Sequence, residues 1–248
     1  MAVLGRKSLG IALGSRALQV AELSANSRGY RLSAHAEFQF GELDSLQDPR
    51  ALGQKLAQFL RQQGFSAGQA VFGLPAQWLM LKEKAQPPAA SEVLNSMLLL
   101  QAERDFSLEP ADLVLDYIPG PRTAEGQTVM LLAALRERIG QVRLLADSAG
   151  LKLQAITATT LALAAAAPEA DVLYLGANGV ELATRGSDGL ARLRHVAPGS
   201  IVKHPGGQPA AMQVAGELRR AMTLSQRSGS FGALTVWDDI GVEPALVQ

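Results

Sequence analysis

Alternating apolar and polar positions open the chain and predict a β-hairpin. In LGIALGSRALQVAEL (residues 9–23), apolar residues recur at every second position on both sides of a Gly14-Ser15 turn. A period of two is typical of a strand with one buried face, and a glycine between two such runs indicates a tight turn. YRLSAHAEF (30–38) continues as a third alternating strand. An amphipathic helix with Pro49 near its start and a short apolar strand, AVFGL (70–74), follow.

The same order of elements recurs in the last third of the chain. VLYLGANGVELAT (172–184) repeats the hairpin, with Leu175-Gly176 at the place of Leu13-Gly14. LARLRHV (190–196) repeats the third strand, an amphipathic stretch over 209–229 repeats the helix, and ALTVW (233–237) repeats the last strand. Two copies of strand, strand, strand, helix, strand predict two similar cores.

A different unit separates the two copies. Its pattern predicts three strands and two helices, within 78–86, 91–106, 113–119, 127–135 and 137–150. This small α+β subdomain leaves the first core after Pro75 and returns near Leu151. The predicted organisation is a first core over residues 1–75 and 151–168, an inserted subdomain over 76–150, and a second core over 169–248.

Composition excludes several classes of function. The 23 Lys and Arg residues balance the 23 Asp and Glu residues, which argues against nucleic acid or an anionic membrane as the main partner. The chain has no cysteine, which excludes disulfides and cysteine metal sites and fits a reducing cytoplasm. No signal peptide is recognisable at the N-terminus, and the longest apolar run, 156–167, is too short to span a bilayer.

No catalytic or metal-binding constellation emerges from the residues themselves. The three histidines, His35, His195 and His204, are dispersed without ligand spacing, and no serine has a histidine partner at recognisable spacing. Asp116-Tyr117 falls on a predicted strand, where a structural role is expected. We therefore predict no cofactor and no metal.

Four stretches resemble the PilM family of type IV pilus assembly proteins, an actin-like ATPase fold, and are also similar to the cytoplasmic part of the type II secretion protein GspL. They are LGIALGSRALQVAELS, VFGLPAQWLMLKE, LLLQAERDFSLEPADLVLDYIP and VMLLAALRERIGQVRLLADSAGLKLQAIT. Together they lie within residues 8–160. The resemblance implies an α/β fold in which two RNase H-like cores are duplicated and an α+β subdomain is inserted.

The resemblance also implies a degenerate nucleotide site. Where the family has a Mg²⁺-binding aspartate in the first hairpin this chain has Ala12, and Gln19 replaces a lysine, although the Gly14-Ser15 turn is retained. In the second hairpin Tyr174 replaces the matching aspartate two residues before Gly176. Asp238 and Asp239 stand where the family has a glycine turn near the adenosine. The prediction is a pseudo-ATPase and not an enzyme.

The resemblance further implies a scaffold that binds the N-terminal tail of a PilN-like membrane protein, the assembly ATPase, or both. The tail is expected in the groove between the first core and the inserted subdomain, near Leu79, Leu98, Ala102 and Phe106. The alternative is an active ATP-binding enzyme of the actin and sugar-kinase class, for which Asp171 would have to replace the missing carboxylate at Tyr174.

The expected location is the cytoplasm, at the periphery of the inner membrane. The second copy stops after its fourth strand, at VEPALVQ, which suggests either a native chain that continues into a membrane span or a reduced family member. Whether the system is a pilus or a secretion apparatus stays open at this stage.

Overall fold

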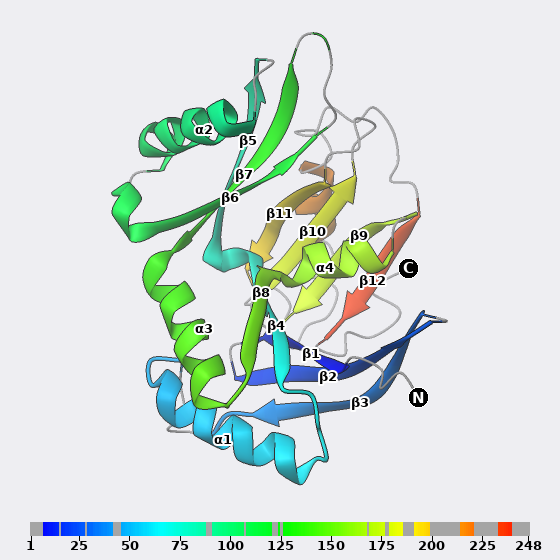
Figure 1. Cartoon of the computed structure of the whole chain (residues 1–248). Coiled ribbons are helices and arrows are strands. Elements are labelled where there is room, and N and C mark those ends of the chain that lie inside the picture. The colour runs from blue at the N-terminus through cyan, green and yellow to red at the C-terminus, as the bar shows by residue number, and fades with distance from the viewer. Residues whose placement is uncertain are drawn as a thin grey trace. The chain divides into compact units, whose positions relative to one another are not determined.

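The structure is a computed structural model of the 248-residue chain. It describes residues 7–14, 16–27, 29–41, 46–87, 91–106, 108–120, 124, 126–167, 169–176, 179–185, 191–198, 214–220 and 233–239. The chain forms two compact units (Figure 1). The first contains Met1–Pro75 and Glu137–Thr159, and the second contains Ala76–Arg136 and Thr160–Gln248. Among the described residues, no helix is long and apolar enough to cross a membrane.

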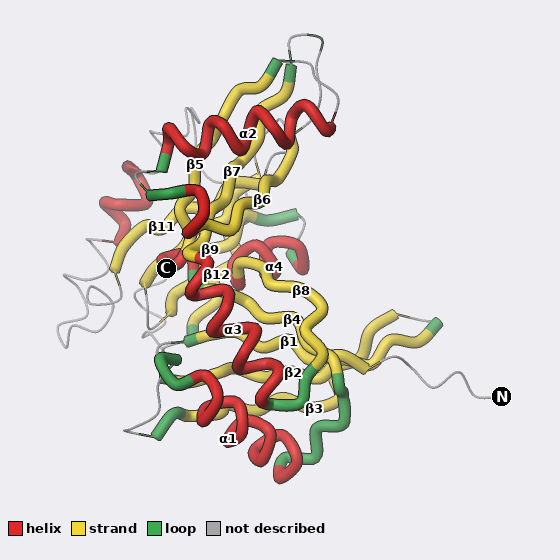
Figure 2. The backbone as a smooth tube through the Cα atoms, turned by 60° about the vertical axis from the view of Figure 1, so that its left-hand side comes forward, coloured by secondary structure: helices red, strands yellow, loops and turns green. Residues whose placement is uncertain are grey.

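The first unit is a five-stranded sheet covered by two helices. Its strands lie in the order β3-β2-β1-β4-β8 and comprise β1 (Lys7–Leu13), β2 (Ala17–Asn26), β3 (Gly29–Gln39), β4 (Gln69–Leu74) and β8 (Lys152–Ala158). The helices are α1 (Pro49–Gln62) and α3 (Arg136–Ser148), which run side by side in both views (Figures 1 and 2). Asp48 caps α1 by accepting from the Ala51 N–H, and Pro49 occupies its first turn.

A second sheet in the second unit repeats the first. Its order is β11-β10-β9-β12, from β9 (Asp171–Gly176), β10 (Gly179–Arg185), β11 (Ala191–Pro198) and β12 (Leu234–Asp238). In both sheets the first three strands are antiparallel neighbours and the fourth pairs parallel with the first. Residues 214–220 are helical, as the repeat requires. The duplicated cores predicted from the two sequence copies are confirmed.

The inserted subdomain is a three-stranded antiparallel sheet with one helix on one face. The strands β5 (Leu79–Gln86), β7 (Gln127–Leu135) and β6 (Leu113–Pro119) lie in the order β5-β7-β6. The helix α2 (Ser91–Asp105) packs on this sheet through a buried cluster that includes Leu94, Leu98, Ala102, Phe106, Leu113, Val129 and Leu131. Short 3₁₀ turns precede β5 at Ala76–Trp78 and β6 at Pro110–Asp112.

The units divide the chain at other points than the predicted boundaries 75, 150 and 168. Helix α3 belongs with the first sheet, although the sequence placed it in the subdomain. Helix α3 packs closely on α1: a Cβ added at Gly53 of α1 would lie 2.6 Å from the carbonyl oxygen of Leu145 in α3. Helix α4 (Thr159–Ala166) begins at the boundary, and from Thr160 onward its residues belong to the second unit and not to the first core.

Candidate functional site

The first hairpin turns so tightly that it requires glycine at position 14. Leu13 and Leu18 face each other in register, and the Gly14 N–H donates to the Ala17 carbonyl oxygen at 2.9 Å. A Cβ at Gly14 would lie 2.7 Å from that oxygen, which no side chain tolerates without a shift. The Gly14 amide is therefore already bonded within the turn. Ser15, the other predicted turn residue, lies outside the described residues.

Ala12 and Gln19 lie directly opposite each other on β1 and β2. Gln19 in turn faces Glu37 on β3, and its Nε2 donates to the Glu37 Oε2 at 2.5 Å. The side chain at position 12 in this set of cross-strand neighbours is a methyl group, which has no oxygen to offer a metal ion. Mg²⁺ is held by carboxylates or by waters that carboxylates order, so position 12 supplies neither.

In the second hairpin an aromatic ring covers the turn. A Cβ at Gly176 would lie 2.5 Å from Cε1 of Tyr174, so the ring occupies the space beside this glycine. The Tyr174 hydroxyl donates to Oδ2 of Asp239 at 3.0 Å. Burial, and then the neighbouring Asp239 carboxylate, raise the pKa of Tyr174 well above its ordinary value, so the phenol is neutral at physiological pH.

A second ring covers the other glycine of the same turn. Gly179 has φ = +153°, and a Cβ there would lie 2.6 Å from Nε2 of His195 on β11. Tyr174 and His195 thus flank the two glycines that bound this turn. No sequence pattern pointed to His195 here, because the contact depends on the pairing of β10 with β11.

The two C-terminal aspartates follow the end of β12, beside the second hairpin. Asp238 pairs in register with Leu175, and the Asp239 N–H donates to the Leu175 carbonyl oxygen at 2.9 Å. Asp238 and Asp239 are both exposed, and the Asp239 carboxylate accepts the hydrogen bond from the Tyr174 hydroxyl. Asp171, the alternative carboxylate, begins β9 and therefore lies at the far end of the strand from Gly176.

Glu181 is a buried carboxylate that sequence reasoning missed. It faces Tyr174 across β9 and β10, at the position that Gln19 occupies in the first hairpin, and it is 1% exposed. It accepts from the Ala76 N–H at 2.6 Å and from the Thr160 hydroxyl. Burial raises its pKa, while these two bonds act in the opposite direction. A lone acid within the apolar run VLYLGANGVELAT was the signal available in the sequence.

The residues predicted to contact a partner lie in the subdomain core. Leu98, Ala102 and Phe106 are 3%, 0% and 4% exposed and belong to the cluster between α2 and its sheet. They lie on the buried face of α2, and among them Leu98 also lines a cleft beside that helix. Leu79 is half-buried and lines a cleft on the other face of the same sheet.

The outer side of α2 carries exposed apolar residues. Val93, Leu99 and Leu100 are 52%, 49% and 60% exposed. Between α2 and strand β6 lies a cleft of about 600 Å³, lined by Leu98, Leu99, Leu115, Asp116, Tyr117, Pro119 and Leu131. Strand β6 is an edge strand, so one side of its main chain has no strand partner among the described residues.

Comparison with known proteins places the fold. No protein-family model and no curated protein matches the sequence. Among solved structures, the chain is similar to the PilM–PilN type IV pilus biogenesis complex, with a TM-score of 0.75 and 22% identity, over 97% of this chain and 84% of that one. The chain is also similar to a Bacteroides thetaiotaomicron protein with an actin-like ATPase fold and unknown function. The TM-score is 0.55 and the sequence identity is 10%, over 98% of this chain and 86% of that one.

This chain has the actin-like fold. The same fold occurs in the cytoplasmic domain of EpsL, an inner membrane component of the type II secretion system of Vibrio cholerae, with a TM-score of 0.60 and 15% identity over 95% of this chain and 83% of that one. In this chain Ala12 belongs to the hairpin of the first unit and Tyr174 to that of the second.

Proposed function

We propose that this protein is a non-hydrolysing scaffold of a type IV pilus or type II secretion platform, bound at the cytoplasmic side of the inner membrane. Its partner in this proposal is the N-terminal tail of a PilN-like membrane protein. The likeness of its fold to a chain of the PilM–PilN complex is the observation that carries the proposal. The likeness to EpsL, from a secretion system, is why both kinds of platform are included.

The geometry of the hairpins supports the pseudo-ATPase part. Phosphoryl transfer from ATP needs Mg²⁺ on the β- and γ-phosphates, and the protein must hold that ion through oxygen ligands. Ala12 has no side-chain oxygen, and Tyr174 offers a neutral phenol whose hydroxyl donates a hydrogen bond to Asp239. The rings of Tyr174 and His195 occupy the space beside Gly176 and Gly179, where phosphate oxygens would approach the main chain.

The cleft between α2 and β6 supports the partner-binding part. An extended peptide can hydrogen-bond to the free side of an edge strand and place alternate side chains in pockets along it. Strand β6 supplies such an edge, while Leu99, Tyr117 and Pro119 supply an apolar lining. Binding here would also cover part of the exposed apolar surface of α2. In a GspL-like arrangement the N-terminal domain of the assembly ATPase is the second candidate partner.

The two exposed leucines of α2 allow a matched test. Leu99 lines the cleft, whereas its neighbour Leu100, of similar exposure, does not. We expect Leu99→Glu to weaken binding of a synthetic PilN-like tail peptide by about tenfold or more, because a carboxylate would enter an apolar contact. Leu100→Glu should change the affinity by less than about threefold.

Fluorescence anisotropy with the labelled tail peptide measures both affinities, and circular dichroism confirms that both variants are folded. Equal affinities for Leu99→Glu and the unmodified protein would exclude the α2–β6 cleft. Failure of the unmodified protein to bind any PilN-like tail or assembly-ATPase domain would contradict the scaffold proposal itself.

A further inference from the structure

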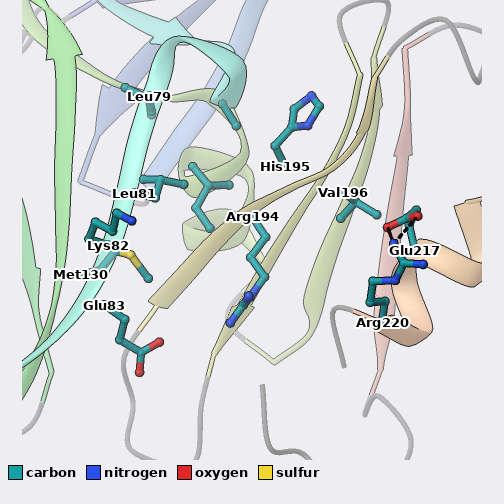
Figure 3. A pocket seen from close by; sticks show the side chains of 12 residues that line it. Leu79, Leu81, Lys82, Glu83, Met130, Arg194, His195, Val196, Glu217 and Arg220 are labelled. Carbon is teal, nitrogen blue, oxygen red and sulfur yellow. Dashed lines mark hydrogen bonds and ion pairs between the residues drawn. The ribbon is translucent and has the colours of Figure 1, made fainter. Parts of the chain in front are cut away.

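A second cleft lies on the face of the subdomain sheet opposite α2. It has a volume of about 450 Å³ and lies entirely within the second unit, between β5, β11 and the helical residues 214–220 (Figure 3). Its apolar lining includes Leu79, Leu81, Met130 and Val196. Nothing in the proposed function uses this cleft, and its lining shares no residue with the α2–β6 cleft.

Two edge strands border this cleft. Strand β5 pairs with β7 alone, and β11 pairs with β10 alone, among the strands of the described residues. Each therefore has one side of its main chain without a strand partner there. Unpaired N–H and C=O groups of an edge strand are a template for a further strand.

An ion pair joins the two edge strands beside the cleft. Arg192 of β11 donates from Nε and Nη2 to the two carboxylate oxygens of Glu83 on β5, at 3.0 and 2.7 Å. This two-pronged geometry is the strongest form of the arginine–carboxylate bond. An arginine of β11 thus has its donors paired by a carboxylate from β5.

The next arginine on the same side of β11 has no such acid. Two residues beyond Arg192, Arg194 lines the cleft, while two residues before Glu83 strand β5 has Leu81, which carries no acceptor. The Nε of Arg194 is buried and makes no hydrogen bond within the described part of the chain. The other acid on this lining, Glu217, is bonded to Arg220 at 3.2 Å. Within the described part of the chain no carboxylate pairs with the Arg194 guanidinium, so its remaining donors in the cleft lining offer a site for an incoming carboxylate.

We propose that this cleft binds an extended acidic segment of a partner protein, which adds as a strand to the edge of β11 and places a carboxylate on Arg194. Side chains of a strand alternate between its two faces. A segment in which acidic and apolar residues alternate can therefore present acids on one face and apolar side chains on the other. The acids face Arg194, and the apolar residues lie against Leu81 and Met130. The mode of recognition is β-strand addition.

The test uses a fluorescein-labelled seven-residue peptide in which valine and glutamate alternate, with a valine–lysine peptide as its counterpart. Anisotropy should show that the unmodified protein binds the valine–glutamate peptide and binds the valine–lysine peptide at least about tenfold more weakly. Arg194→Gln should reduce the affinity for the acidic peptide by about tenfold or more. Arg50→Gln, which removes the same charge from an exposed position on α1, should leave it unchanged.

A third peptide tests the main-chain part without any protein variant. Methylation of alternate amide nitrogens in the valine–glutamate peptide removes the donors that strand addition requires, so its binding to the unmodified protein should be lost. The proposal is overturned if the acidic peptide does not bind, if both charge patterns bind equally, or if the methylated peptide binds as well as its parent. Undiminished binding to a folded Arg194→Gln variant would also overturn it. None of these outcomes depends on the PilN-like tail.

Discussion

Glu181 is a buried acid whose charge affects the stability of the second unit. Its carboxylate bonds Ala76 and Thr160, the first residues of the two segments that make up that unit. Burial raises its folded pKa above the ordinary value of 4.5. A raised carboxyl pKa means that the folded state holds its proton to higher pH than the unfolded state, so stability falls as pH rises from about 4.5 through the folded pKa.

Glu181→Gln should remove the loss of folding stability that Glu181 causes as pH rises. The amide keeps one acceptor oxygen and never ionises, so the melting temperature of the variant relative to the unmodified protein should increase as pH rises through this window. Glu181→Ala, which leaves both donors without an acceptor, should be less stable than Glu181→Gln by about 1–3 kcal/mol at any pH. Thermal melts of the three proteins between about pH 4 and 8 measure both effects. A difference between Glu181→Gln and the unmodified protein that does not change with pH would contradict the argument.

Glu22 of the first unit has the opposite pH dependence. Burial alone would raise its pKa, but bonds from Lys7 and from the N–H groups of Ser66 and Ala67 outweigh burial and lower it. Its stabilising effect is present above the unfolded pKa and is lost as pH falls through the folded one. The sequence placed both acids on strands, yet it could not distinguish them, because their surroundings come from segments remote in the chain.

At the scale of elements, the second hairpin depends on the fit of Tyr174 against Gly176. Gly176→Ala places a Cβ 2.5 Å from the ring and should destabilise the protein by about 1–3 kcal/mol. In a Tyr174→Ala background the ring is absent, so the same change should cost much less. Chemical denaturation of the two single variants and the double variant forms a cycle that measures this coupling. Additive effects of the two substitutions would show that the ring does not cover the glycine.

The strands and most helices followed from periodicity, and the repeated strand order made the fold predictable. The sequence could not predict which unit contains α3, because the apolar stripe of this helix fits any sheet. The close approach of the α3 backbone to Gly53 of α1 decides where the helix packs. The family resemblance led us to expect Leu98, Ala102 and Phe106 near a partner, and the structure places them on the buried face of α2. An apolar helical stripe looks alike whether it faces a core or a partner.

At the scale of the whole molecule, the pseudo-ATPase proposal rests on Ala12 in the first unit and on Tyr174 in the second. We expect calorimetry with Mg-ATP to give no heat beyond dilution, and Mg-ATP to leave the melting temperature unchanged, since a ligand that does not bind cannot stabilise. Ala12→Asp alone should not restore binding, because Tyr174 still occupies the second hairpin. Binding with turnover by the unmodified protein would favour the ATP-dependent enzyme over the scaffold.

The division of the first unit between two chain segments has a consequence during translation. Strand β4 pairs on one side with β1 and on the other with β8, which begins at Lys152. The ribosome therefore makes the whole of Ala76–Arg136 before β8 can cover that edge. At about 5–20 residues per second, the nascent β4 stays open for on the order of 10 s. An open edge recruits other strands, so the half-made first sheet is exposed to wrong pairing until β8 has been made.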